Sequence, residues 1–111
     1  VSGLETYCIA PVGMPSYLTR GNPDPLKALL PNNPWDEASF QLAARVHNQM
    51  LVNCRMPDRG VRRIRFMTVI KGQKRPAILV EGGYLSNPNE ARKINTGAYR
   101  QRLAAGIAAA L

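Results

Sequence analysis

The sequence contains few of the side chains that proteins use to bind transition metals. His47 is the only histidine among 111 residues, and the two cysteines, Cys8 and Cys54, fit no spacing typical of a metal site. His47 has no His, Cys or Asp at ligand spacing on the same helical face, so we interpret it as an ordinary residue at the rim of its helix. We interpret the cysteines as buried small apolar residues, with a disulfide as the alternative.

Long apolar runs and acidic residues are also scarce. No run approaches the roughly 20 apolar residues that cross a bilayer, so no transmembrane segment is predicted. The first residues, Val1-Ser2-Gly3, do not form a signal peptide, and a start without methionine is expected of a chain cut from a longer one. Fifteen Lys and Arg against seven Asp and Glu give a net charge of +8. This charge favours polyanionic partners, such as nucleic acid, acidic lipid surfaces or anionic cell-wall polymers, without choosing among them.

What is present fits one small α/β domain. Apolar residues make up 45% of the chain, which is enough for one core. In the first predicted strand, Glu5 and Tyr7 share one face while Leu4, Thr6 and Cys8 share the other. A turn is expected over 57–60. The patterns predict strands over 4–10, 63–70 and 76–80, and helices over 34–53, over 88–94 and from 98 onwards.

Two asparagine–proline pairs have the form of helix starts. Asn33 is expected to cap the helix over 34–53, whose apolar stripe contains Ala38, Leu42, Val46 and Met50. Asn87 is expected to cap the next helix, with Glu90 reaching back as in a capping box. The six prolines within 11–34 predict a long loop, in which 24–30 forms one helical turn.

The segment 76–88 is the most informative in the chain. A proline and a short apolar run lead to Glu81, which is followed at once by two glycines. The run predicts a strand buried on both faces in the middle of a parallel sheet, with Glu81 where the strand ends. A lone carboxylate at that position is costly unless it has a partner or a role. A catalytic or ligand-binding role and a structural pairing with an arginine both remain open.

The order of several motifs makes the chain resemble a known family. It is similar to the C-terminal half of the zinc-dependent N-acetylmuramoyl-L-alanine amidases of bacterial cell walls. The resemblance covers 1–111 apart from 11–34, which looks like an insertion. The matching segments are Ser2-Gly3-Leu4-Glu5-Thr6-Tyr7, Ser39 with Leu42-Ala43, Arg59-Gly60-Val61-Arg62, Pro76-Ala77-Ile78-Leu79-Val80-Glu81-Gly82-Gly83-Tyr84-Leu85-Ser86-Asn87, and Tyr99-Arg100 with Ala104-Ala105-Gly106-Ile107.

The resemblance implies a three-layer α/β sandwich with a mostly parallel sheet and a peptidoglycan hydrolase of the cell envelope, periplasmic or secreted. Such enzymes cut the amide between N-acetylmuramic acid and L-alanine. In the family, two histidines and a glutamate hold the zinc, and these ligands precede the segment matched by this chain. A second glutamate, matched here by Glu81, assists the attacking water. We therefore expect this chain to supply the catalytic glutamate but no metal ligand, and to be inactive alone.

Three further residues are candidates for substrate binding. Arg59 and Arg62 either face the substrate or anchor their turn by pairing with a carboxylate. Glu5 either lines the cleft or pairs with an arginine. The loop 11–34 is either a lid over the cleft or a passive insertion.

Other functions and partners stay open at this stage. The alternative function is a non-catalytic module that binds peptidoglycan or regulates a partner, motivated by the missing metal ligands. Nucleic-acid binding is not expected, because the basic segment over 59–65 has little aromatic interleaving for base stacking. Sheet edges left open by the missing half would be covered by that half or by a homodimer.

Overall fold

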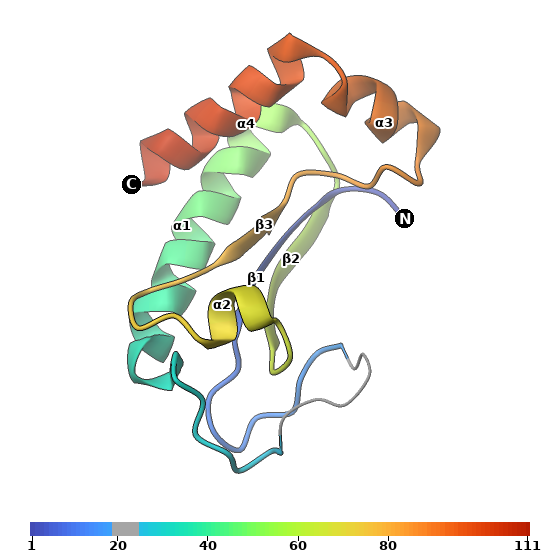
Figure 1. Ribbon diagram of the computed structural model, residues 1–111. Coiled ribbons are helices and arrows are strands. Elements are labelled where there is room, and N and C mark those ends of the chain that lie inside the picture. The colour runs from blue at the N-terminus through green and yellow to red at the C-terminus, as the bar shows by residue number, and fades with distance from the viewer. Residues whose placement is uncertain (19–24) are drawn as a thin grey trace.

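The computed structural model describes residues 1–18 and 25–111 of the chain (Figure 1). Asp24, the first residue of the helical turn expected over 24–30, lies outside this part, and 25–30 contains a turn but no helix. The elements are β1 (Leu4–Ile9), the short 3-10 helix η1 (Asn33–Trp35), α1 (Asp36–Cys54), β2 (Asp58–Ile64), α2 (Thr68–Lys71), β3 (Leu79–Glu81), α3 (Pro88–Ile94) and α4 (Gly97–Ala110).

The sheet has three strands in the order β2-β1-β3, which confirms the α/β class. The central strand β1 is buried along its whole length; it is parallel to β2 and antiparallel to β3. The expectation of a central strand before Glu81 is wrong, because β3 is a half-buried edge strand of three residues. The segment leading to it is bound by side chains instead. Asn32 donates to the Gln73 and Arg75 carbonyls, and the Ala77 N–H donates to Ser39 Oγ.

The second strand begins earlier and ends earlier than predicted. The turn expected over 57–60 is largely part of β2, where Gly60 adopts a φ of +85°. The register shifts there: Leu4 pairs with Asp58, but Thr6 pairs with Val61, so β2 contains a bulge. The strand ends at Ile64 because its partner strand β1 ends at the paired Ile9. The chain then turns into α2, where the sequence predicted continued strand.

The core lies on both faces of the sheet. On one face, α1 and α4 lie against each other over the sheet (Figure 1), and Leu4 packs with Val46, Met50 and Tyr99. On the other face, Tyr7 and Ile9 form a second cluster with residues of β2, α2 and the loop. The alternation predicted for β1 is therefore confirmed. The cysteines are buried and free, and burial raises the pKa of the Cys8 thiol to about 11.

The buried face of α1 confirms the predicted stripe in part. Val46 and Met50 are buried as predicted, whereas Ala38 is exposed and Leu42 half-buried. Ser39 and His47, beside the predicted stripe, are buried as well, and His47 is only 3% exposed. The interpretation of His47 as a rim residue is therefore wrong. Its Nδ1 lies 3.0 Å from Thr6 Oγ1, and its Nε2 lies 2.7 Å from Asp58 Oδ1. His47 thus joins α1 to β1 and to the start of β2.

The predicted cap at Asn87 is confirmed, whereas the predictions that Asn33 caps a helix and that Glu90 forms a capping box are wrong. Asn87 Oδ1 accepts from the N–H groups of Asn89 and Glu90, as expected for the cap of α3. Asn33 caps no helix; its side chain accepts from Leu30 N–H and donates to the Ala10 carbonyl. Glu90 makes no capping box, because its carboxylate is used elsewhere, as described below. In the part of the chain that the structure describes, no helix has the length and apolar character needed to span a bilayer.

Candidate active site

A cavity of about 400 Å³ lies on the face of the sheet opposite α1. β1 contributes Glu5 and Tyr7 to it, and β3 contributes Glu81. The loop after β1 adds Tyr17 and Leu18. Arg59 of β2, Met67, Tyr84 and Val1 complete the lining. The cavity therefore gathers residues from four distant parts of the chain around two carboxylates.

The two carboxylates face the cavity from directly opposite positions on neighbouring strands. Glu5 and Glu81 are paired across the antiparallel β1–β3 ladder, and residues paired in this way project to the same side of a sheet. The sequence placed Glu81 at the end of its strand, and this prediction is confirmed. It did not place Glu5 beside it, because the pairing depends on the antiparallel direction of β3.

Glu5 is held by four side chains. It is 1% exposed, and its Oε1 accepts hydrogen bonds from the hydroxyls of Tyr7 and Tyr84. Its Oε2 lies 3.5 Å from Arg59 Nε and 3.7 Å from Arg62 Nε. Both interpretations of Glu5 therefore hold, because it lines the cavity and is also paired with arginines.

The hydroxyls around Glu5 remain protonated donors at neutral pH. Burial, followed by the hydrogen bond to Glu5, raises the pKa of Tyr7 far above its ordinary value. Burial also raises the pKa of Tyr84. A tyrosine is already protonated at neutral pH, so both hydroxyls donate to the Glu5 carboxylate there, and the raised pKa values extend this to more alkaline pH.

Glu81 differs from Glu5 in having no such partners. It is half-buried and lines the cavity. Within residues 1–18 and 25–111 its carboxylate makes no hydrogen bond or ion pair. Arg59 and Arg62 are engaged by Glu5, and none of the described arginines is paired with Glu81. A carboxylate that is sheltered and unpaired can accept a proton from a water molecule in the cavity.

The two candidate arginines each connect Glu5 to a tyrosine. The guanidinium of Arg59 lies 5.3 Å from the ring centre of Tyr84, and that of Arg62 lies 4.1 Å from the ring centre of Tyr17. Both arginine side chains are about one-third exposed. The structure thus gives both arginines an anchoring contact, and Arg59 also lines the cavity.

The residues present do not form a zinc cage. In the described part of the chain, no group of three or more His, Cys, Asp or Glu side chains comes together. Glu5 is already bound by two arginines and two tyrosines, and His47 lies on the other face of the sheet with Thr6. Glu81 alone could not hold a catalytic zinc, which takes three protein ligands.

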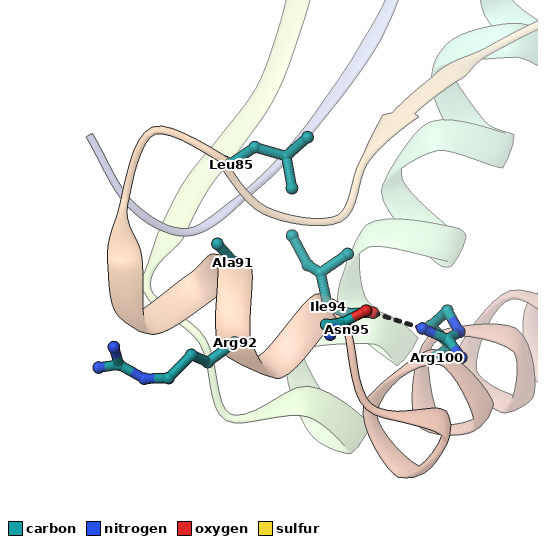
Figure 2. A pocket seen from close by; sticks show the side chains of 6 residues that line it. All are labelled: Leu85, Ala91, Arg92, Ile94, Asn95 and Arg100. Atoms are coloured by element: carbon teal, nitrogen blue, oxygen red, sulfur yellow. Dashed lines mark hydrogen bonds between the residues drawn. The ribbon is translucent and has the colours of Figure 1, made fainter.

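A second hollow, of about 500 Å³, lies between α3, the start of α4 and the segment around Leu85 (Figure 2). Leu85 and Ile94 line it, and the Arg100 guanidinium closes one side by donating to the Ile94 carbonyl at 2.8 Å. Figure 2 shows the Arg92 side chain pointing away from this hollow. None of its lining residues is acidic. It therefore offers no general base, and the cavity around Glu81 is the candidate active site.

Two features of the cavity were missed from the sequence. Tyr84 was named only as part of a matching segment, yet its hydroxyl binds Glu5, and its backbone N–H donates to buried Glu90 at 2.9 Å. Tyr17 was not singled out at all. A signal for Tyr7 did exist, since it shares the Glu5 face of the first strand, but no local pattern connects Tyr17 or Tyr84 with that strand.

Comparisons with known proteins show the family of the chain. A family described as N-acetylmuramoyl-L-alanine amidase matches residues 1–111. Two proteins of Bacillus subtilis (strain 168), YrvJ and the N-acetylmuramoyl-L-alanine amidase LytC, are 32% and 33% identical over 71 and 69 residues. These matches cover 64% and 62% of this chain and 14% of each relative.

Solved structures show the same relationship. An N-acetylmuramoyl-L-alanine amidase from Clostridium difficile 630 superimposes with a TM-score of 0.72 at 27% identity. The catalytic domain of CwlV from Bacillus (Paenibacillus) polymyxa var. colistinus gives 0.70 at 27% identity. Each comparison covers 99% of this chain and 46% of the other. The chain thus spans less than half of the solved amidase chains.

Proposed function

Because the chain belongs to the N-acetylmuramoyl-L-alanine amidase family, we propose that it supplies the general base of a zinc-dependent peptidoglycan amidase. The bond cut is the amide between N-acetylmuramic acid and L-alanine. The observation that carries the proposal is the contrast between two opposed carboxylates. Glu5 is bound by arginines and tyrosines, whereas Glu81 lines the cavity and has no side-chain partner among the described residues.

The proposed step uses Glu81 twice. Its carboxylate takes a proton from water as the water oxygen attacks the amide carbonyl carbon. It then gives that proton to the leaving nitrogen as the carbon–nitrogen bond breaks, so that a carboxylic acid and an amine are released. We place the zinc ligands in the other half of the enzyme, because the described residues of this chain do not fit a cage for the metal.

We assign the other candidates by their contacts. Arg59 is partly exposed and lines the cavity, so it is placed to meet an anionic group of the peptidoglycan stem peptide. Glu5 is almost fully buried and acts by fixing Arg59, Arg62 and Tyr84. In this assignment Glu5 and Arg62 are positioning residues rather than direct contacts.

The setting of the proposed reaction follows from the substrate. Peptidoglycan lies in the cell envelope, so we place the protein in the periplasm or outside the cell. The outer edges of β2 and β3 have no strand partner in the described part of the chain, and the metal-binding half of the enzyme or a second copy would cover them.

A non-catalytic module that binds peptidoglycan or regulates a partner is the second candidate function. It is favoured by one observation: the described residues bring no metal-binding group together. Under this proposal the cavity would bind cell-wall fragments without cutting them, whatever chain surrounds it.

The test uses the complete reading frame that encodes these residues. With zinc present, purified peptidoglycan should gain new α-amino groups of L-alanine, and Glu81→Gln should lower the rate about 10²-fold to 10⁴-fold while binding persists. Full turnover by Glu81→Gln would refute the role of Glu81. Binding by the wild-type protein without any turnover would instead support the non-catalytic module. Zinc titration of the 111-residue chain should show no tight stoichiometric uptake.

A further inference from the structure

The loop between β1 and α1 is fixed by one buried arginine. Arg65 is 1% exposed and has no carboxylate partner in the described part of the chain. Its Nη1 donates to the carbonyls of Ala10 and Pro11 at 3.3 and 3.1 Å. Its Nη2 donates to those of Pro25 and Ala28 at 3.0 and 2.6 Å. One guanidinium thus joins the start of the loop to its later part.

This contact requires an arginine. A planar guanidinium directs its donors in a fixed fork, which matches several carbonyls at once, whereas a lysine ammonium acts as a compact point charge. Burying the charge is costly without such compensation. The backbone of Arg65 adds a further contact, because its N–H donates to Ser16 Oγ at 3.1 Å. The described part of the loop is therefore held against the end of β2.

The fixed loop places an aromatic ring at the cavity. The Tyr17 N–H donates to the Arg63 carbonyl at 2.9 Å, which ties this residue to the edge of β2. Its ring lies under the Arg62 guanidinium, which is itself paired with Glu5. Tyr17 remains 49% exposed and lines the same cavity as Glu81.

The cavity has a second ring held in the same manner. Tyr84 lies near Arg59, and Arg59 is also paired with Glu5. One buried carboxylate therefore orients two arginine–tyrosine pairs. Both arginines belong to β2, whereas one tyrosine lies on the segment after β3 and the other on the loop. Such rings combine an apolar body with a polar hydroxyl, which suits the C–H faces and hydroxyls of a sugar. An anionic stem peptide would instead be drawn to the guanidinium of Arg59.

We propose that Tyr17 is a specificity-determining residue that contacts the sugar of the substrate, and that Arg65 is the positioning residue that holds the segment bearing Tyr17. The inference rests on the proposed function, because it takes the occupant of the cavity to be a muramoyl peptide. It makes the segment around Tyr17 a fixed wall of the cavity, in place of the moving lid or the passive insertion that the sequence left open for the loop.

The test compares two probes in NMR titrations of the 111-residue chain. One is N-acetylmuramoyl-L-alanyl-D-isoglutamine, and the other is the same dipeptide without the sugar. Tyr17→Ala should weaken binding of the sugar-bearing probe about 5-fold to 10-fold and leave the bare dipeptide unchanged. Leu29→Ala is the matched control, since Leu29 is 74% exposed in the same loop and does not line the cavity.

Arg65→Lys tests the positioning role. It keeps the charge but loses the fork, so it should reproduce the loss of sugar affinity and speed chymotrypsin cleavage after Tyr17, with the circular dichroism spectrum unchanged. Ser16→Ala removes the two hydrogen bonds of Ser16 Oγ, from the Arg65 N–H and to the Leu18 carbonyl, and leaves the guanidinium in place. It should loosen the same segment more mildly and serves if the lysine variant fails to fold. Unchanged proteolysis and sugar affinity in both variants would overturn the role of Arg65.

The outcomes separate this proposal from the proposed function. Equal affinity of Tyr17→Ala and wild type for the sugar-bearing probe overturns the sugar contact, while the role of Glu81 stands or falls by turnover of the complete protein. A wild-type chain that binds only the bare dipeptide also overturns the sugar contact alone. A wild type that binds neither probe, together with a complete protein that shows no turnover, overturns both.

Discussion

Glu5 and Glu81 stand directly opposite each other on β1 and β3, yet within the described part of the chain only Glu5 is bound by other side chains. Like charges at directly opposed positions of a sheet are destabilising. Here two arginines and two tyrosine hydroxyls gather around Glu5 and offset its charge. The pairing therefore leaves one carboxylate fixed and the other available for proton transfer.

The two carboxylates should respond differently to the same substitution. Glu5→Gln removes the buried anion from two guanidiniums and should lower the free energy of unfolding by about 2–3 kcal/mol. Glu81→Gln removes no contact in the described part of the chain and should change it by less than about 0.5 kcal/mol. Urea unfolding followed by circular dichroism measures both. Equal losses in the two variants would contradict the asymmetry of the site.

Glu90 should contribute to stability through two backbone N–H groups. Its carboxylate is 4% exposed and accepts from Gly3 N–H at 2.8 Å and from Tyr84 N–H at 2.9 Å. In Glu90→Gln the amide nitrogen cannot accept, so one buried N–H loses its partner at a cost of about 1–3 kcal/mol. Glu37→Gln, at an exposed position, is the control and should stay near wild type. Urea or thermal unfolding of wild type, Glu90→Gln and Glu37→Gln measures the three stabilities. Equal stability of the two variants would contradict the role of Glu90.

Close packing of α1 against α4 depends on the absence of a side chain at Gly106. A Cβ at this position would lie 3.1 Å from the Gln49 carbonyl oxygen, so Gly106→Val should force the helices apart and cost about 1–3 kcal/mol. Gly97, at the start of the same helix, has open space around it, and Gly97→Ala should stabilise the protein by about 0.4–1 kcal/mol. The melting temperature should fall in Gly106→Val and rise in Gly97→Ala. An unchanged melting temperature in Gly106→Val would refute the packing argument.

Acid should weaken the protein through Asp58. The hydrogen bond with His47 lowers the pKa of Asp58 below its ordinary value of 3.8. A lowered pKa in the folded state stabilises the protein above the ordinary value, and this stabilisation is lost as the pH falls from about 4 through the lowered pKa. Because Asp58 is largely exposed, the effect should be about 0.5 kcal/mol. The stability difference between wild type and Asp58→Asn should therefore be present at pH 7 and shrink at pH 3.

Local patterns predicted those features that depend on neighbouring residues in the chain. The helix over 34–53 was found from its periodicity, and α1 spans Asp36–Cys54. The Asn87 cap was found because a cap needs only the next few N–H groups. The burial of His47 was missed, since the sheet covers a wider strip of α1 than the predicted stripe, and His47 lies next to Val46 within that strip. β2 was misplaced because the ladder with β1, rather than local composition, decides where it begins and ends.

The sequence by itself determined that Glu81 ends a strand, that Glu5 and Tyr7 share a face, and that the chain resembles one half of an amidase. Only the tertiary structure decided which of the two glutamates is held by arginines and tyrosines and which has no such partner in the described part of the chain. The reason is physical. The partners of Glu5 come from β1 itself, from β2 and from the segment after β3, and only the folded sheet brings these groups within reach of one carboxylate.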